Sequence, residues 1–251
     1  MLEQIINNNK EKITGITHVG AGIGQEVRIY LSNNINNINL FEPQRQALLE
    51  LRQYNKYENI NIYEFGLANF DGDIELHVTD HNFGASSSIL KPKKHKQYFP
   101  EIEFKTKETI KVRKYISLDI KDANFLVMDV QGFELEVLKG FENSLNNYDF
   151  IFSEVSRKEF YENNALISDI DNYLKKYNFI RYKVNWTSNK PQGDAFYIRK
   201  KNINLINIFY LLIIGRFQNS YIYFFINFLK NKQKAIYTIK KLSKSIFGRN
   251  Y

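Results

Sequence analysis

The sequence predicts an α/β fold with a mostly parallel β-sheet, followed by a separate C-terminal tail. Between positions 13 and 152, short apolar runs alternate with helical stretches, which is typical of strands and helices in a parallel sheet. The chain has 251 residues, of which 43% are hydrophobic, and it can bury one sizeable core. Its charge is divided unevenly, because the last 51 residues carry +9 and the chain as a whole carries +8.

The first part of the chain is expected to form three strands separated by two helices. The predicted strands are residues 13–19, 38–42 and 60–65, and the predicted helices are residues 25–31 and 45–54. Pro43 lies just before the second helix, where a proline suits the start of a helix. We predict two further strands, 74–79 and 110–115, on either side of a polar loop at 80–107 that is long enough to be functional.

The second part continues the alternation and then changes to a hairpin. Residues 125–129 and 150–152 are predicted strands, and the helix between them is expected at 134–139. A helix at 168–177 has Ser168 in its N-cap position. Residues 179–184 and 195–199 are predicted to pair antiparallel around a turn that contains Pro191 and Gly193. No internal repeat is visible.

The charge distribution separates a domain at 1–200 from a tail at 201–251. The tail contains seven Lys, two Arg and no acidic residue, which is +9 and leaves −1 for residues 1–200. A nearly neutral folded part argues against a dedicated nucleic-acid enzyme. Cysteine is absent, so disulfides and cysteine-ligated zinc are excluded. The polar residues 1–12 do not resemble a signal sequence, and we expect a cytoplasmic protein.

The tail is basic, apolar and aromatic. Its apolar segments, 205–214 and 221–229, are shorter than the roughly 20 residues that cross a bilayer. They fit helices that lie on an anionic membrane surface, which would attach the protein peripherally to the inner face of the cell membrane. Packing of these helices on the domain or on another subunit is an equal alternative.

A glycine-rich turn follows the first predicted strand. It reads His18-Val19-Gly20-Ala21-Gly22-Ile23-Gly24, and such small residues allow a tight turn and close approach to a ligand. A dinucleotide pyrophosphate or mere tight packing would suit the same turn. The next strand ends in Glu42 and Pro43, roughly 20 residues later, where an acid can accept hydrogen bonds from both ribose hydroxyls of an adenosine cofactor. A surface glutamate at a helix start is the alternative.

Acidic side chains also follow the fourth and fifth strands. Asp129, Gln131 and Glu134 come after one strand and Glu154 ends the next, so we expect all four at the same sheet edge. Repelling carboxylates are tolerable where they face water, a substrate hydroxyl, a metal or a positively charged sulfonium. The alternative is that Glu134 and Glu154 only cap helices and pair with Lys or Arg.

Over about residues 14–200 the sequence resembles the FkbM-type methyltransferases, in particular a branch with a His-x-Gly-Ala motif. The matching residues occur in the family's order and spacing. They are His18 to Ala21 with Gly24, Gln25 and Glu26; Glu42 and Pro43; Ser86 to Ile89; Leu118 and Asp119; Asp129 to Gly132 with Glu134; Val137 to Gly140; Glu154 and Val155; and Gly193 to Tyr197. Gly22 departs from a histidine common in this branch, and Val127 and Met128 replace a lysine-containing approach to the acid in the wider family.

The resemblance implies a Rossmann-like class I methyltransferase with a seven-stranded, mostly parallel sheet and an antiparallel final strand. It implies S-adenosylmethionine as donor. Cofactor contacts are expected first from the glycine-rich turn and from the acid after the second strand; these residues are His18, Gly20, Ala21, Gly22, Gly24, Glu42 and Pro43. We expect Gly66, Leu67 and Ala68 to border the adenine, and Asp129 and Gln131 to close the cleft near the transferred methyl group.

The expected reaction is in-line displacement at the methyl group, with a base that removes the acceptor's proton. Asp129 is the first candidate for the base. His81, flanked by Asp80 and Asn82, is the second, although a lone loop histidine is more often only solvated. Glu154 is the third. Magnesium held by Asp129 and Glu154 is a further alternative, for which two carboxylates are weak evidence.

The acceptor pocket is expected to involve Ser86, Ser87 and Ser88, Glu134 and Glu154, although the serines also fit a simple turn. The resemblance implies a hydroxyl acceptor on a sugar, surface glycan or glycan precursor. N- or O-methylation of a lipid, peptide or small metabolite is the alternative enzymatic function. A non-catalytic binding subunit and an NAD-linked oxidoreductase are two further alternatives, and a cofactor-binding assay separates them.

Overall fold

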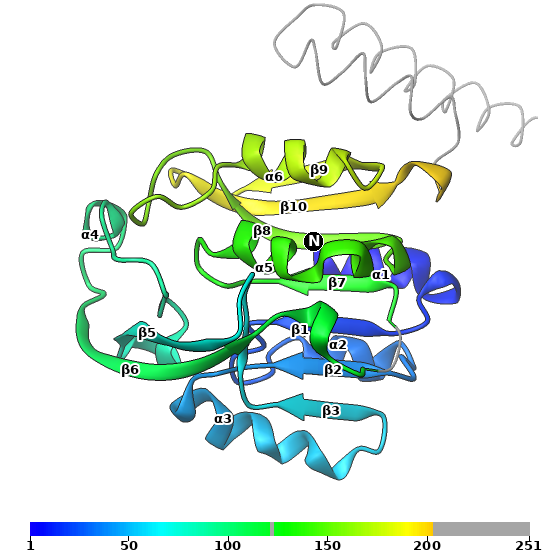
Figure 1. Ribbon diagram of the computed structural model, residues 1–251, viewed down its shortest axis with the longest axis horizontal. Helices are drawn as coiled ribbons and strands as arrows, with labels where there is room; N and C mark the ends of the chain where they lie inside the picture. The colour runs from blue at the N-terminus through cyan, green and yellow to red at the C-terminus, as the bar shows by residue number, and fades with distance from the viewer. Residues whose placement is uncertain (121–122, 203–251) are drawn as a thin grey trace, which may run out of the picture. The chain divides into compact units, whose positions relative to one another are not determined.

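A seven-stranded sheet in the order β3-β2-β1-β7-β8-β10-β9 forms the centre of the computed structural model, which describes residues 1–120 and 123–202 (Figure 1). Strands β1, β2, β3, β7 and β8 pair in parallel, and β10 runs antiparallel to both β8 and β9. The strands are β1 (Ile16–Val19), β2 (Ile38–Phe41), β3 (Ile60–Tyr63), β7 (Phe125–Met128), β8 (Phe150–Ser156), β9 (Phe179–Trp186) and β10 (Gln192–Arg199). The predicted α/β class, parallel sheet and antiparallel end are confirmed.

Helices cover both faces of this sheet, with α5 and α6 in front of it and α1 and α2 behind it in Figure 1. The helices are α1 (Leu2–Asn9), α2 (Val27–Ser32), α3 (Arg45–Leu51), α4 (His95–Tyr98), α5 (Glu134–Phe141) and α6 (Ile167–Lys175). We did not predict α1 from the sequence. Leu2, Ile5 and Ile6 are its buried residues, and their spacing of three and four places them on one face of the helix.

A second, three-stranded sheet lies on the side toward which the arrowheads of β2, β3 and β7 point (Figure 1). Its order is β4-β6-β5, with β4 (Gly66–Leu67), β5 (Gly72–Thr79) and β6 (Phe104–Arg113), and β5 and β6 pair antiparallel. The predicted loop at 80–107 therefore ends at residue 103, which corrects the sequence interpretation. Lys105 and Lys107 made this stretch resemble a loop, but they are exposed residues of a two-stranded ribbon with a solvated face.

Several element ends differ from the predictions. The helix at 45–54 is α3 only as far as Leu51, and a 3₁₀ helix, Arg52–Lys56, continues it. Helix α6 begins at Ile167, so Ser168 is not its N-cap as predicted. The carboxylate of Asp169 caps the helix instead, accepting a hydrogen bond from the backbone N–H of Leu166 at 2.8 Å.

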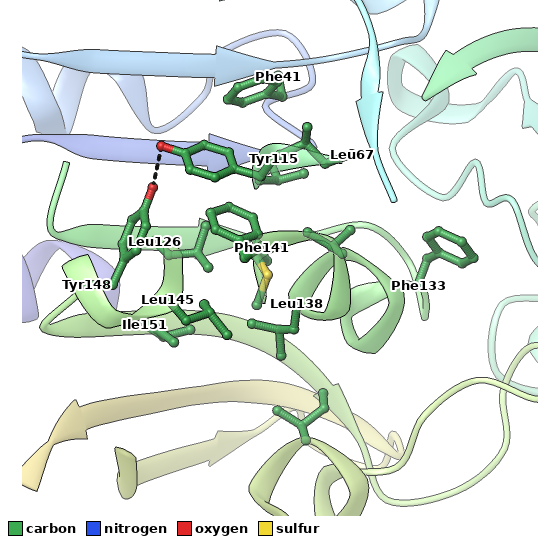
Figure 2. Packing of buried hydrophobic residues seen from close by; sticks show 14 of the residues in the cluster. Phe41, Leu67, Tyr115, Leu126, Phe133, Leu138, Phe141, Leu145, Tyr148 and Ile151 are labelled. Carbon is green, nitrogen blue, oxygen red and sulfur yellow. Dashed lines mark hydrogen bonds between the residues drawn. The ribbon is translucent and has the colours of Figure 1, made fainter. Parts of the chain in front are cut away.

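An aromatic core fixes the connection after β6 to the main sheet (Figure 2). The rings of Tyr115 and Phe141 stack at a centroid distance of 4.0 Å and an angle of 9°. The hydroxyl of Tyr148 donates to the Tyr115 oxygen at 2.9 Å, and it also lies 2.8 Å from Oγ1 of Thr17 on β1. The second sheet is therefore anchored to α5 and β1 by buried contacts on its chain connection.

The predicted tail, with its apolar segments 205–214 and 221–229, lies outside the described residues except for positions 201 and 202. Within residues 1–120 and 123–202, no helix combines the length and apolarity needed to cross a membrane.

Candidate cofactor and active site

A cavity of about 440 Å³ opens at the carboxyl ends of β1, β2, β7 and β8. Leu76 of β5 and Ile110 of β6 line its second-sheet side, and residues 82–85 with 87 and 89 form part of its edge. Helix α1 contributes Leu2 and Glu3. Ligands of open α/β sheets bind at this edge, so the cavity is the candidate site of the chain.

The turn from β1 to α2 forms one wall, where Gly20, Ala21 and Gly22 line the cavity. Gly20 has φ +77°, and a Cβ there would overlap the carbonyl oxygen of Asp129, so β1 and β7 end in close contact only because this residue is glycine. Gly22 has φ +53° and faces open space. Gly24 was predicted to contact cofactor, but it lies outside this lining, and its small size instead allows α3 to pack close by.

Glu42 at the end of β2 lies in the next wall, beside Pro43. One carboxylate oxygen accepts a hydrogen bond from the N–H of Gly22 at 2.8 Å, and the other accepts from the N–H of Gln44 at 2.8 Å. The residue is 6% exposed. Each carboxylate oxygen can accept more than one hydrogen bond, so Glu42 can shape the turn and still bind a hydroxyl in the cavity.

Glu42 is expected to make the free energy of unfolding depend on pH. Burial, partly offset by the backbone hydrogen bonds from Gln44 and Gly22, raises the pKa of Glu42 from 4.5 to about 7. The folded chain therefore holds this proton more tightly than the unfolded chain. The resulting stability is complete below about pH 4.5 and is lost as pH rises to about 7, by up to about 3 kcal/mol.

The matched variant is Glu42→Gln, which keeps the shape of the side chain and removes the titration. Urea unfolding at pH 5 and pH 8 should show a smaller loss of stability in the variant than in the wild type. Equal losses in the two proteins would contradict the assignment of this effect to Glu42.

The segment after β3 was predicted to border an adenine. Gly66 and Leu67 line the cavity, but Ala68 does not. Ala68 is fully buried beneath α5, where a Cβ on Gly140 would overlap its carbonyl oxygen. Its part in the sequence pattern is therefore explained by the close packing of α5, and its predicted cofactor contact is not supported by its position.

His18, on β1, lines the cavity but is only 3% exposed. Its Nδ1 lies 3.0 Å from the hydroxyl of Tyr30 on α2. Burial lowers the pKa of His18, so the imidazole is neutral near pH 7. Its hydrogen bond positions α2 behind the glycine-rich turn.

Two carboxylates and one amide meet at the ends of β7 and β8. Nε2 of Gln131 donates to Oδ1 of Asp129 at 2.6 Å and to Oε2 of Glu154 at 3.1 Å, and all three residues line the cavity. Asp129 is an exposed residue that lines the cavity. Desolvation raises the pKa of Asp129 to about 6, against the effect of the Gln131 hydrogen bond, and raises the pKa of Glu154 well above its ordinary value.

Glu134, predicted to bind substrate, lies outside the lining of the cavity. It is the first residue of α5 and is 3% exposed. Its Oε1 accepts hydrogen bonds from the N–H groups of Val130 and Gly132, at 3.2 and 3.1 Å. Glu134 therefore holds the turn between β7 and α5 in shape. These bonds go to residues before the helix, so they are not the helix cap of the alternative.

Only one of the site residues predicted in the long loop lines the cavity. Ser87 lines it, while Ser86 and Ser88 do not, and Oγ of Ser88 donates to the carbonyl oxygen of Gln131 at 2.7 Å. His81 is exposed and outside the lining. The position of His81 does not support its predicted role as a base.

The cavity also contains residues that the sequence analysis did not single out. Phe83 is 43% exposed and, like Asn82, has a positive φ, so this turn presents a large apolar ring at the cavity. Asp194 of β10 lies opposite Glu154 in the strand pairing. Nε2 of Gln44 is buried without a hydrogen-bond partner. Phe83 is a single apolar residue in a polar loop, and no pattern in the sequence marks it as a site residue. Asp194, in contrast, lies within one of the matched motifs.

The cavity is acidic. Among the described residues that line it there is no Lys or Arg, and the acidic residues are Glu3, Glu26, Glu42, Asp129, Glu154 and Asp194. In the part of the chain that the structure describes, no group of three or more His, Cys, Asp or Glu side chains is arranged to hold a metal ion. The surplus of carboxylates at the β7 and β8 ends favours a ligand with positive charge.

Comparison with known proteins gives three findings. Residues 18–181 match the family model described as the methyltransferase FkbM domain. The 2-O-methyltransferase NoeI of Sinorhizobium fredii is 23% identical over 188 residues, which cover 70% of this chain and 77% of NoeI. The crystal structure of methyltransferase FkbM from Methylobacillus flagellatus KT superposes with a TM-score of 0.51 and 16% identity, over 74% of this chain and 43% of that one, so this chain matches less than half of its length.

Proposed function

Since the chain belongs to the FkbM methyltransferase family, we propose that it transfers the methyl group of S-adenosylmethionine to a hydroxyl oxygen of a sugar, a surface glycan or a glycan precursor. Membership makes the chain an S-adenosylmethionine-dependent methyltransferase of FkbM type. The choice of a hydroxyl acceptor is supported by the similarity to NoeI, which is named as a 2-O-methyltransferase.

The observation that carries the proposal is the convergence of three predicted groups on one cavity. The glycine-rich turn, Glu42 and the pair of Asp129 and Glu154 all line it. Open space at Gly22 and the unpartnered amide nitrogen of Gln44 provide room and a free donor for a polar cofactor. The residues present therefore fit S-adenosylmethionine, with Glu42 at the ribose and the glycine-rich turn at the methionine part.

When bound, S-adenosylmethionine supplies an electrophilic methyl group on a positively charged sulfur. Asp129 and Glu154 stabilise positive charge at their end of the cavity. Asp129 is exposed there and accepts the proton of the acceptor hydroxyl as a general base. With a pKa of about 6 it is ionised near neutral pH, and Gln131 orients its carboxylate by hydrogen bonding. Positioning of the acceptor in line with the methyl group supplies further rate enhancement.

Calorimetric titration with S-adenosylhomocysteine tests the donor site without knowledge of the acceptor. The wild type should bind S-adenosylhomocysteine and not NAD. Glu42→Ala should weaken binding by roughly 10-fold or more, because the ribose loses a buried hydrogen-bond acceptor.

Glu64→Ala is the matched control. Glu64 is an exposed glutamate that pairs with Arg52 outside the cavity, and its removal should leave the affinity unchanged. Folding of each variant is checked by thermal unfolding. A folded wild type that binds NAD but not S-adenosylhomocysteine would support the oxidoreductase alternative and contradict the proposal.

A further inference from the structure

The amide of Gln131 joins the two carboxylates that face the candidate reaction site. Its nitrogen has two hydrogens, and it donates to both Asp129 and Glu154, at 2.6 and 3.1 Å. The opposite orientation of the amide would place its oxygen against the two carboxylates, which would be repulsive. Only one orientation of the Gln131 side chain therefore suits an ionised pair.

Tyr161 contacts the other end of the same amide. Its hydroxyl donates to Oε1 of Gln131 at 3.0 Å, and the Tyr161 side chain is 1% exposed. The hydroxyl also lies 3.2 Å from the carbonyl oxygen of Ser86, but it has one hydrogen to donate. Gln131 offers the shorter contact, and its oxygen is turned toward Tyr161 because its nitrogen serves the carboxylates.

The backbone of Gln131 adopts a left-handed conformation that other contacts maintain. Its φ is +52°, and the next residue, Gly132, has φ +98°. A left-handed conformation costs a residue other than glycine about 1 kcal/mol or more, so other contacts must maintain it. Oγ of Ser88 provides one such contact by donating to the Gln131 carbonyl oxygen at 2.7 Å. Ser88 and Tyr161 thus hold the main chain and the side chain of one residue.

We propose that Tyr161 is a positioning residue of the methyl-transfer site, whose hydroxyl fixes the Gln131 amide so that it donates to Asp129 and Glu154 together. The inference rests on the proposed function, because it assumes that these carboxylates face the sulfonium and the acceptor. Tyr161 acts through Gln131 and does not line the cavity.

The consequence of this arrangement is electrostatic. Asp129 and Glu154 face further acids from neighbouring elements, namely Glu26 before α2, Glu134 of α5 and Asp194 of β10. The nearby His18 is neutral because burial lowers its pKa. Donation from Gln131 lowers the pKa of Asp129 against burial and these acids. Freeing the amide to rotate should therefore raise the pKa of the pair and reduce its negative charge near neutral pH.

The test compares the affinities for S-adenosylmethionine, which carries a positive sulfonium, and S-adenosylhomocysteine, which lacks it, by calorimetry from pH 5 to pH 8. In the wild type, the ratio of the two affinities should rise with pH as the carboxylates ionise. In Tyr161→Phe, the midpoint of this rise should move upward by about half a pH unit, which lowers the ratio near pH 6 by about twofold.

Tyr197→Phe is the matched control, because Tyr197 is also 1% exposed and its hydroxyl donates to a carboxylate, Asp171, at 3.0 Å, outside the cavity lining. Its midpoint should equal that of the wild type. Gln131→Met removes the amide itself and should shift the midpoint at least as far as Tyr161→Phe. Adding Tyr161→Phe to Gln131→Met should have no further effect, because the two residues act in series.

The outcomes separate the inference from the proposed function. If the wild type binds neither compound, the proposed function is overturned and the inference falls with it. If the wild type binds both but the ratio has the same pH dependence in Tyr161→Phe, or no pH dependence at all, the positioning role alone is overturned. Additive shifts in the double variant would overturn it as well. If Tyr161→Phe does not fold, Gln131→Met alone tests the amide, and an unchanged midpoint in that variant would overturn the inference.

Discussion

Replacing Asp129 by asparagine is expected to reduce turnover by roughly 10²- to 10⁴-fold, because the acceptor hydroxyl loses its general base. The affinity for S-adenosylhomocysteine should stay close to that of the wild type, since asparagine has nearly the same size and this product lacks the positive charge. Turnover is measured as release of S-adenosylhomocysteine with a sugar acceptor found by screening. In the wild type it should rise with pH through about 6, the pKa of Asp129, because the base acts in its ionised form.

His81→Ala provides the matching comparison, because His81 was the second candidate base and lies exposed outside the cavity lining. Its turnover should remain within a few-fold of the wild type. Full activity of Asp129→Asn with unchanged product affinity would remove Asp129 from the chemistry. A large loss of turnover in His81→Ala would indicate that His81, in the long loop, is the general base.

Gly20→Ala is expected to destabilise the fold by roughly 3 kcal/mol or more and to abolish binding of S-adenosylhomocysteine. The left-handed backbone costs alanine about 1–2 kcal/mol, and overpacking typically adds about 1–3 kcal/mol. The overpacking is severe here because the new Cβ would overlap the backbone carbonyl oxygen of Asp129, which cannot rotate away as a side chain could. The free energy of unfolding is measured in urea.

Gly22→Ala separates the conformational cost of a left-handed alanine from the cost of overpacking. Gly22 also has a positive φ, of +53°, but a Cβ there meets no atom within 4 Å. The variant should therefore lose only the conformational part, about 1–2 kcal/mol. Equal destabilisation of Gly20→Ala and Gly22→Ala would show that contact between the ends of β1 and β7 does not determine the requirement for glycine.

Much of the main sheet was predictable because its strands are buried on both sides. The runs that became β1, β2 and β7 consist of fully buried residues between polar turns, and this contrast is visible in the sequence. The start of β6 was missed because its exposed lysines belong to an antiparallel ribbon with one solvated face. Helix α1 was missed because its three buried residues stand among Asn and Glu.

The site was predictable where a residue type marks the end of a strand. Glu42, Asp129 and Glu154 were placed on one edge by that logic, and they line one cavity. Position at the end of a strand does not distinguish a residue that lines the cavity from one that only allows close packing or holds a turn. For this reason Ala68, Gly24 and Glu134 were predicted to contact cofactor or substrate. Tyr161 gave no signal, because its contact with Gln131 spans 30 positions and depends on the path of the loop after β8.

The acidic lining of the cavity acts as a filter on the charge of the molecules that enter it. A phosphate or uronic acid carboxylate beside the reacting hydroxyl would approach several carboxylates with no lysine or arginine among the described lining residues to receive it. In a space partly removed from water, such repulsion is weakly screened. For the sugar acceptor that we propose, the same repulsion would favour a neutral or amino sugar over an anionic one at the reacting ring, and an anionic carrier of the sugar would have to stay outside the cavity.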